Sequence, residues 1–275
     1  MDELYVLARS VLLDALEALG PHREACVLVG AQAIYLRVGE ADLGMAPFTT
    51  DGDLVIDPRR LSDIPPLERG LLAAGFVLAD GSEVGIWMTR RPTRTSRGVD
   101  VAVDLLVPEA VSPGSGRRAA RLQGHEPRAA RIARGLEGVL FDADLMQVGT
   151  LDDHERRGFD VRVAGPAGLL VSKLHKIADR AGSPRAKDKD AYDVLRLLRG
   201  TPAPEMAARV RRFRNESLSK EVTADALRLL GSLFGRAEGI GSQMAARAAG
   251  GLADAQETAA SCEALAEELL QELRA

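Results

Sequence analysis

Hydrophobic residues recur at helical spacing over the first twenty positions, MDELYVLARSVLLDALEALG, which predicts an amphipathic helix. The next apolar segment is the short run ACVLV at 25–29, which ends at Gly30. The helical pattern AQAIYLR follows at 31–37. The chain is therefore expected to begin with a helix, followed by a strand, a glycine turn and a second helix.

Apolar runs rich in β-branched residues continue through the first 164 positions. They predict strands at 51–57, 83–89, 98–107, 137–141 and 158–163, together with a helix over 61–74 that ends at Gly75. Strands thus alternate with helices, but not as a simple parallel βαβ series. The expected fold class is α/β (α+β), with a mixed sheet and flanking helices.

From Gly165 onward every apolar pattern has helical period and no strand is predicted. Pro166 stands where a helix would begin, and LLVSKLHKIADR has apolar residues three and four apart. Several further helical segments follow up to the C-terminus. We therefore predict two domains, a sheet domain at 1–164 and a helical bundle at 165–275.

Composition narrows the class of protein. The chain has 275 residues, 46% of them hydrophobic and 28% charged, which suits one or two globular domains and leaves no apolar run long enough for a membrane span. Asp2 and Glu3 stand where a signal peptide would carry positive charge, so a cytoplasmic protein is expected. The two cysteines, Cys26 and Cys262, have no metal-ligand spacing.

The net charge of −4 argues against a uniformly basic nucleic-acid binder, but the charge is unevenly distributed. Between Val84 and Leu140, ten arginines face five acids, so ten minus five gives a local charge of +5. This Arg-rich segment is either a surface for a polyanion or a solvated arginine-rich surface, and the sequence favours neither.

The strongest chemical signal is the sequence Thr49-Thr50-Asp51-Gly52-Asp53 at the start of a predicted strand. Residues two apart on a strand point to the same face, so Asp51 and Asp53 would project together and attract a divalent cation such as Mg²⁺. Alone, the pattern fits a surface turn that binds nothing. A third acid, Asp104, interrupts the apolar run VAVDLLV, and an acid in such a strand is rare unless it is paired or binds metal.

Two further places suit phosphate binding. Gly30 and Ala31 form a turn at a helix entrance, where backbone N–H groups and the helix dipole favour an anion. Lys173 and Lys176 lie on one helix stripe, and the segment KDKDAYD at 187–193 opens the next helix with acids. For most charged helix faces a solvated surface is the simpler interpretation, but Lys173 follows an apolar run.

Taken in order, the segments Gly-Ala, Thr-Thr-Asp-Gly-Asp, Val-Asp-Leu-Leu, Ser-Lys-Leu and Lys-Asp-Lys-Asp-Ala-Tyr-Asp resemble the AbiEii-type nucleotidyltransferases, the toxin halves of AbiE and MenT toxin–antitoxin systems. The likeness covers roughly residues 25 to 198. It implies a DNA polymerase β-like nucleotidyltransferase fold followed by a helical C-terminal domain. It also implies an NTP substrate, Mg²⁺ (two ions), and a cognate antitoxin as partner.

The resemblance assigns roles residue by residue. Asp51, Asp53 and Asp104 match the metal-binding carboxylates, and Lys173 matches a lysine that contacts nucleotide phosphates. Asp190, or else Asp193, matches the acid of the last motif. The residues expected at the nucleotide are Gly30, Ala31, Thr50, Lys173 and Lys187. The chain departs from the wider superfamily at Ala31, where a serine is common, and at Gly52, where a hydrophobic residue is usual.

Three functions follow as hypotheses. The first is a toxin that transfers a nucleoside monophosphate to RNA, in particular to the 3′ acceptor end of tRNA, with the Arg-rich segment as the RNA surface. The second keeps the chemistry but takes a small hydroxylated acceptor such as an antibiotic, with Asp142 and Asp144 as acids near the acceptor hydroxyls. The third is an inactive nucleotidyltransferase fold that serves as a binding module, against which the retention of the three carboxylates and Lys173 argues.

Overall fold

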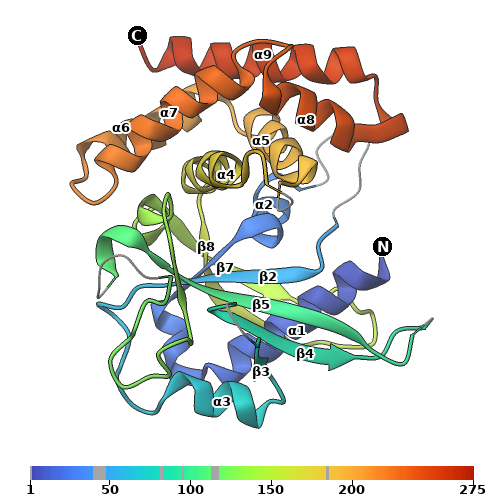
Figure 1. Ribbon diagram of the computed structural model, residues 1–275, viewed down its shortest axis with the longest axis vertical. Coiled ribbons are helices and arrows are strands. Elements are labelled where there is room, and N and C mark those ends of the chain that lie inside the picture. The colour runs from blue at the N-terminus through green and yellow to red at the C-terminus, as the bar shows by residue number, and fades with distance from the viewer. Residues whose placement is uncertain (1, 40–47, 81–82, 95, 113–117, 184–185) are drawn as a thin grey trace. The chain divides into compact units, whose positions relative to one another are not determined.

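The computed structural model describes residues 2–39, 48–80, 83–94, 96–112, 118–183 and 186–275 (Figure 1). The chain divides into two compact units. We call Met1–Ala33, Pro47–Ala133 and Ala143–Ala164 the sheet unit, and Ile34–Ala46, Arg134–Asp142 and Gly165–Ala275 the helical unit. Each is described by itself below.

The sheet unit is built on a mixed sheet whose strands follow the order β3-β4-β5-β2-β1-β8-β7, with β6 paired to β5. The pairs β1/β8, β2/β5 and β5/β6 are parallel and the others antiparallel. The strands are β1 (Cys26–Val29), β2 (Asp51–Ile56), β3 (Val77–Leu78), β4 (Ile86–Arg91), β5 (Val99–Pro108), β6 (Arg131–Ala133), β7 (Ala143–Gly149) and β8 (Gly158–Ala164). The mixed sheet expected from the sequence is thus confirmed.

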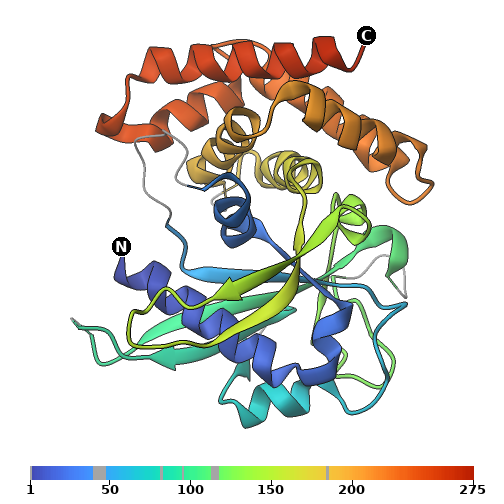
Figure 2. The ribbon, with the colours of Figure 1, turned by 180° about the vertical axis from the view of Figure 1, so that it is seen from behind.

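Helix α1 (Glu3–Ala18) packs across β2 and β5 on one face of this sheet, as Figure 2 shows. It is capped by Asp2, whose carboxylate accepts hydrogen bonds from the Leu4 and Tyr5 amides. The buried side chains Leu12, Leu13 and Leu16 anchor it. The remaining helical elements of the unit are η1 (Gly20–Ala25), α3 (Leu67–Ala73) and η2 (Glu109–Val111), and α2 (Gly30–Val38) starts in it.

The helical unit contains no strand among its described residues and packs its helices through one apolar core. Buried side chains from successive helices meet there, among them Leu170, Leu195, Phe213 and Leu230. Its elements are η3 (Glu137–Leu140), α4 (Pro166–Arg180), α5 (Asp188–Gly200), α6 (Ala203–Asn215), α7 (Lys220–Phe234), α8 (Ile240–Ala249), η4 (Gly250–Leu252) and α9 (Ala255–Glu272).

Two sequence predictions of secondary structure need correction, and the strands β3, β6 and β7 were not predicted. The helix expected at 61–74 begins only at Leu67. A helix that started at residue 61 could not run through Pro65 and Pro66, because proline has no backbone N–H group to donate to the preceding turn. The strand expected at 137–141 is the 3₁₀ helix η3, whose apolar residues pack against α4 rather than into the sheet. The edge strand β7 was not predicted, because Val148 is its one buried residue and apolar alternation is weak.

Candidate active site

The strand register brings the three predicted carboxylates to one face of the sheet. On the parallel strands β2 and β5, Asp53 stands opposite Asp104, while Asp51 lies two positions earlier on β2. Side chains at paired positions, and at alternate positions of one strand, point to the same face. We call Asp51, Asp53 and Asp104 the carboxylate face. Asp53 is buried, and the Asp104 side chain is 14% exposed.

Gly52 lies between the two acids of β2 and faces the other side of the sheet. A Cβ atom at this position would stand 3.2 Å from Leu12 Cδ1 of α1. The departure from the superfamily pattern at Gly52 therefore has a packing reason: α1 approaches the strand too closely for a large hydrophobic side chain. The carboxylates point away from α1, on the opposite face.

Both the backbone conformation at position 30 and the atoms around it require a glycine. It joins β1 to α2 with φ +69°, in the left-handed region, and a Cβ atom there would lie 2.0 Å from Asp53 Oδ2. The residue at the start of α2 must consequently lack a side chain for Asp53 to hold its position. The helix entrance predicted as a phosphate site does lie against a carboxylate of the sheet. Ala31, the next residue, is buried.

Two of the three acids have described partners of different kinds. Asp51 Oδ1 accepts a hydrogen bond of 2.5 Å from the buried Thr49 hydroxyl, and Thr50 beside it is exposed. Asp104 forms an ion pair with Arg131 of β6, whose side chain is 27% exposed. Sequence reasoning missed Arg131, because its approach to Asp104 depends on the pairing of β5 with the unpredicted strand β6.

A divalent cation fits the donor set of this face, since Mg²⁺ prefers carboxylate oxygens and three carboxylates project together from adjacent strands. The side chains are not arranged as a ready metal site. Among the described residues, no three His, Cys, Asp or Glu side chains converge as ligands.

The second predicted cluster lies in the helical unit. Lys173 of α4 is buried, and its ammonium donates hydrogen bonds to Asp190 at 2.7 Å and Asp193 at 2.6 Å, both on α5. We call these three residues the lysine centre. Both acids left open by the last motif thus contact Lys173. Lys187 is an exposed residue directly before α5.

Charge pairing dominates the electrostatics of the lysine centre. Burial acts to lower the pKa of Lys173, but the charges of Asp193 and Asp190 outweigh it and hold that pKa above its ordinary value. Burial likewise acts to raise the pKa of Asp190, but Lys173, Lys176 and Arg180 hold it below its ordinary range. With its ammonium enclosed by two aspartates, Lys173 links α4 to α5 in this structure. Its predicted contact with a nucleotide phosphate stays a prediction.

Five of the ten arginines of the Arg-rich segment form ion pairs within the protein. Ion pairs join Arg90 to Asp100, Arg91 to Asp14, Arg94 to Glu3, Arg131 to Asp104, and Arg134 to Glu221 and Asp225. Arg128 donates to the backbone carbonyls of Ala79 and Glu83. Arg117 lies outside the described residues. Much of the local positive charge is thus neutralised.

Asp142 and Asp144, the acids considered for a small hydroxylated acceptor, belong to different units. Asp142 is buried and accepts hydrogen bonds from Arg209 at 2.7 Å and from the Gly168 amide at 3.2 Å. It therefore ties the first turn of α4 to α6. Asp144 is exposed on the edge strand β7. The expectation that these two acids serve one acceptor site stays a prediction.

The family model described as "Nucleotidyl transferase AbiEii toxin, Type IV TA system" matches residues 11–267, which is nearly the whole chain. The chain belongs to this family. The matched range includes the carboxylate face, Gly30 and the lysine centre. AbiEii membership establishes nucleotidyl transfer as the activity and makes the protein the toxin component of a toxin–antitoxin pair, which implies an NTP substrate and an antitoxin partner.

Other comparisons add little to the AbiEii assignment. No curated protein matches the chain. Among solved structures, an antigenic nucleotidyltransferase-like protein from Paracoccidioides brasiliensis is similar at 18% sequence identity and a TM-score of 0.40, over 82% of this chain and 93% of that one. Among the helices that the structure describes, none has the length and apolar character needed to cross a membrane.

Proposed function

We propose that this AbiEii-family toxin transfers a nucleoside monophosphate from an NTP to RNA, at the 3′ acceptor end of tRNA, and thereby blocks translation in the cytoplasm. The carboxylate face is the observation that supports a metal-dependent transfer. Its three acids occupy neighbouring positions of two parallel strands, with Gly30 against Asp53.

In the proposed mechanism, Asp51, Asp53 and Asp104 would hold Mg²⁺, two ions in the complete site. The bound metal would supply charge that neutralises the triphosphate and stabilises the leaving pyrophosphate. The N-terminus of α2 at Gly30 offers backbone N–H groups and the positive end of its dipole to a phosphate. An acceptor hydroxyl attacks the α-phosphate in line, its proton passes toward Asp104, and the bond to pyrophosphate breaks.

The residues expected around the nucleotide differ in how accessible they are to a ligand. Thr50 is exposed beside Asp51, and Lys187 is an exposed cation, so a ligand can reach both from solvent. Lys173 holds Asp190 and Asp193 in place. We therefore propose a positioning role for Lys173 in the helical unit, and contact with phosphate would require it to leave one of the aspartates.

The test is incubation of the purified protein with Mg²⁺, each α-³²P-labelled NTP in turn and total tRNA. We expect label on tRNA with one or more nucleotides, and none with Asp51→Ala. Asp100→Ala is the matched control, because Asp100 lies on β5 but is exposed and pairs with Arg90. If folded protein binds NTP yet leaves RNA unlabelled, the acceptor proposed here is wrong and a small hydroxylated acceptor takes its place.

A further inference from the structure

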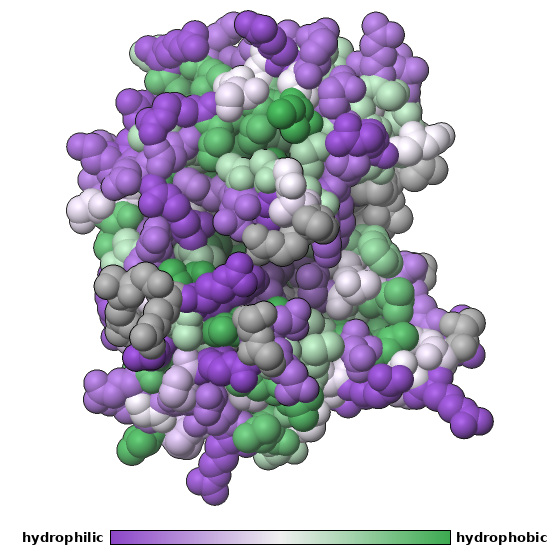
Figure 3. Space-filling view, in the orientation of Figure 1, coloured by the Kyte–Doolittle hydropathy of each residue, from purple (hydrophilic) through white to green (hydrophobic). Residues whose placement is uncertain are grey.

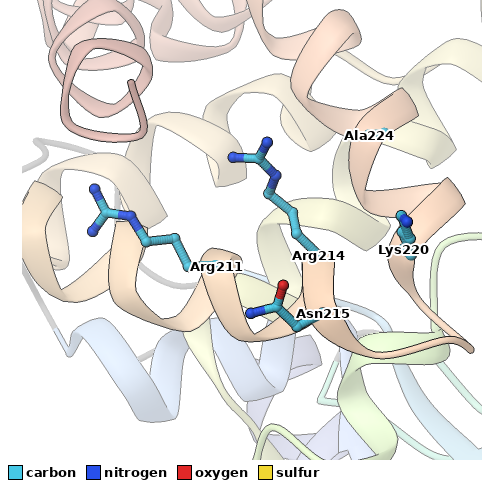
Figure 4. A pocket seen from close by; sticks show the side chains of 5 residues that line it. All are labelled: Arg211, Arg214, Asn215, Lys220 and Ala224. Atoms are coloured by element: carbon cyan, nitrogen blue, oxygen red, sulfur yellow. The ribbon is translucent and has the colours of Figure 1, made fainter. Parts of the chain in front are cut away.

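A pocket of about 470 Å³ opens between α6 and α7 of the helical unit. Arg211, Arg214 and Asn215 reach it from the end of α6, and Lys220 and Ala224 from the start of α7, as Figure 4 shows. We call it the α6–α7 groove. Three of its five lining residues are cationic, and none is acidic.

Much of this positive charge is available to a ligand. Arg214 and Lys220 are exposed, and neither side chain forms a hydrogen bond or ion pair with the part of the chain that the structure describes. Arg211 donates to the backbone carbonyl of Glu272 and lies 3.9 Å from its carboxylate. The nearby Glu221 does not line the groove and pairs with Arg134. In the Arg-rich segment, by contrast, five of the ten arginines form ion pairs with acids.

The lining also indicates the kind of anion. Two guanidinium groups, an ammonium and an amide offer many N–H donors, and the planar guanidinium fork matches phosphate oxygens. Ala224 is the one apolar residue among the lining residues, so the groove offers neither an aromatic ring for stacking a base nor the apolar anchor typical of a protein interface. Hydrophilic side chains also prevail over α6 and the start of α7 in Figure 3. These features suit a sugar–phosphate backbone.

We propose that the α6–α7 groove binds the phosphodiester backbone of the acceptor RNA. This inference rests on the proposed function for the identity of the RNA, and it moves the RNA-binding surface from the Arg-rich segment to the helical unit. Backbone contacts carry no sequence information, so the groove would position the RNA while its 3′ end is selected elsewhere.

The test compares the double variant Arg214→Glu/Lys220→Glu with Arg212→Glu, which changes an exposed arginine of α6 that does not line the groove. Affinity for fluorescein-labelled total tRNA is measured by anisotropy over a salt series, without NTP. We expect the double variant to bind tRNA roughly tenfold or more weakly. Its affinity should also depend less on salt, because a protein that contacts fewer phosphates releases fewer counterions when it binds. Transfer should show a raised KM for tRNA and a retained kcat.

Several outcomes separate the inference from the proposed function. If the double variant and Arg212→Glu bind tRNA with equal affinity and equal salt dependence, the groove does not bind RNA, even if the wild type labels tRNA. A double variant that keeps tRNA affinity but loses affinity for poly-L-glutamate would overturn it in favour of an acidic protein ligand. The variant Arg214→Lys/Lys220→Arg keeps the charge and should bind like wild type, and a thermal melt by circular dichroism checks the folding of each variant. A wild type that labels no RNA refutes the proposed function. The anisotropy measurement still shows whether the groove binds RNA.

Discussion

The carboxylate face and the lysine centre both gather acids and a cation, but they hold them differently. Arg131 reaches Asp104 from a neighbouring strand and is 27% exposed, so a ligand arriving from solvent can displace it. Lys173 is 4% exposed and lies between Asp190 and Asp193, the latter fully buried. Exposure of the cation thus distinguishes the proposed metal and nucleotide site from a cluster that links two helices.

We expect a substitution at the carboxylate face to lower activity, and one at the lysine centre to lower stability. Asp53→Asn should lower nucleotidyl transfer by about a thousandfold or more, because a metal ligand is lost, while the thermal midpoint changes little. Activity is measured with labelled NTP and acceptor, and unfolding by circular dichroism. Asp100→Asn, an exposed acid on β5, serves as control and should retain activity. Substantial activity in Asp53→Asn would show that this acid holds no essential metal.

Removing the cation of the lysine centre should instead affect stability. Lys173→Met removes the ammonium that contacts both buried carboxylates and leaves Asp190 only its longer contacts with Lys176 and Arg180, and the expected loss in free energy of unfolding is about 3–5 kcal/mol. Denaturant titration measures it. Lys176→Met is the matched control, because Lys176 lies on the same helix, is 31% exposed and stands 3.4 Å from Asp190. A small loss for Lys173→Met, similar to that of the control, would contradict the structural role.

The pH dependence of that loss has a definite sign. The pKa of Asp190 is lower in the folded protein than its ordinary value of 3.8, so its contribution to stability is present above pH 3.8 and is lost as pH falls further. The pKa of Lys173 is higher than its ordinary value of 10.5, so its contribution is complete below pH 10.5 and is lost at still higher pH. The stability advantage of wild type over Lys173→Met should therefore shrink below pH 3.8 and above pH 10.5.

A glycine substitution tests how tightly the carboxylate face is built. Gly30→Ala places a methyl group against Asp53 and also strains the backbone at φ +69°. Gly182 has the same φ, and no atom of the residues that the structure describes would lie within 4 Å of a Cβ there, so Gly182→Ala serves as the control for backbone strain, about 1–2 kcal/mol. We expect Gly30→Ala to exceed that loss in the free energy of unfolding and to reduce transfer as well. Equal stability losses in the two variants would mean that Asp53 moves aside without cost.

The sequence predicted those parts of the molecule that depend on local pattern. The apolar runs around Asp53 and Asp104 identified β2 and β5, and alternation within β2 placed Asp51 and Asp53 on one face. The helical unit followed from periodicity. Long-range pairing was harder to predict. Nothing near Arg131 indicates that β6 would pair with β5 and bring its side chain to Asp104. Likewise, the pattern singled out Lys173 but did not show that Asp190 and Asp193 enclose it.

The smallest expected effect concerns Arg131 itself. If the pair with Asp104 competes with the cation, Arg131→Ala should strengthen metal binding by a few-fold, since a partly exposed ion pair contributes about 1 kcal/mol or less. Mn²⁺ titration by calorimetry, without nucleotide, measures this directly. Arg90→Ala, which removes the exposed pair with Asp100, is the control and should leave Mn²⁺ affinity unchanged. Weaker Mn²⁺ binding in Arg131→Ala would show that Arg131 orients Asp104 for the metal instead of competing with it. Both cations would then hold acids in place, and the two centres would differ only in how deeply the cation is buried.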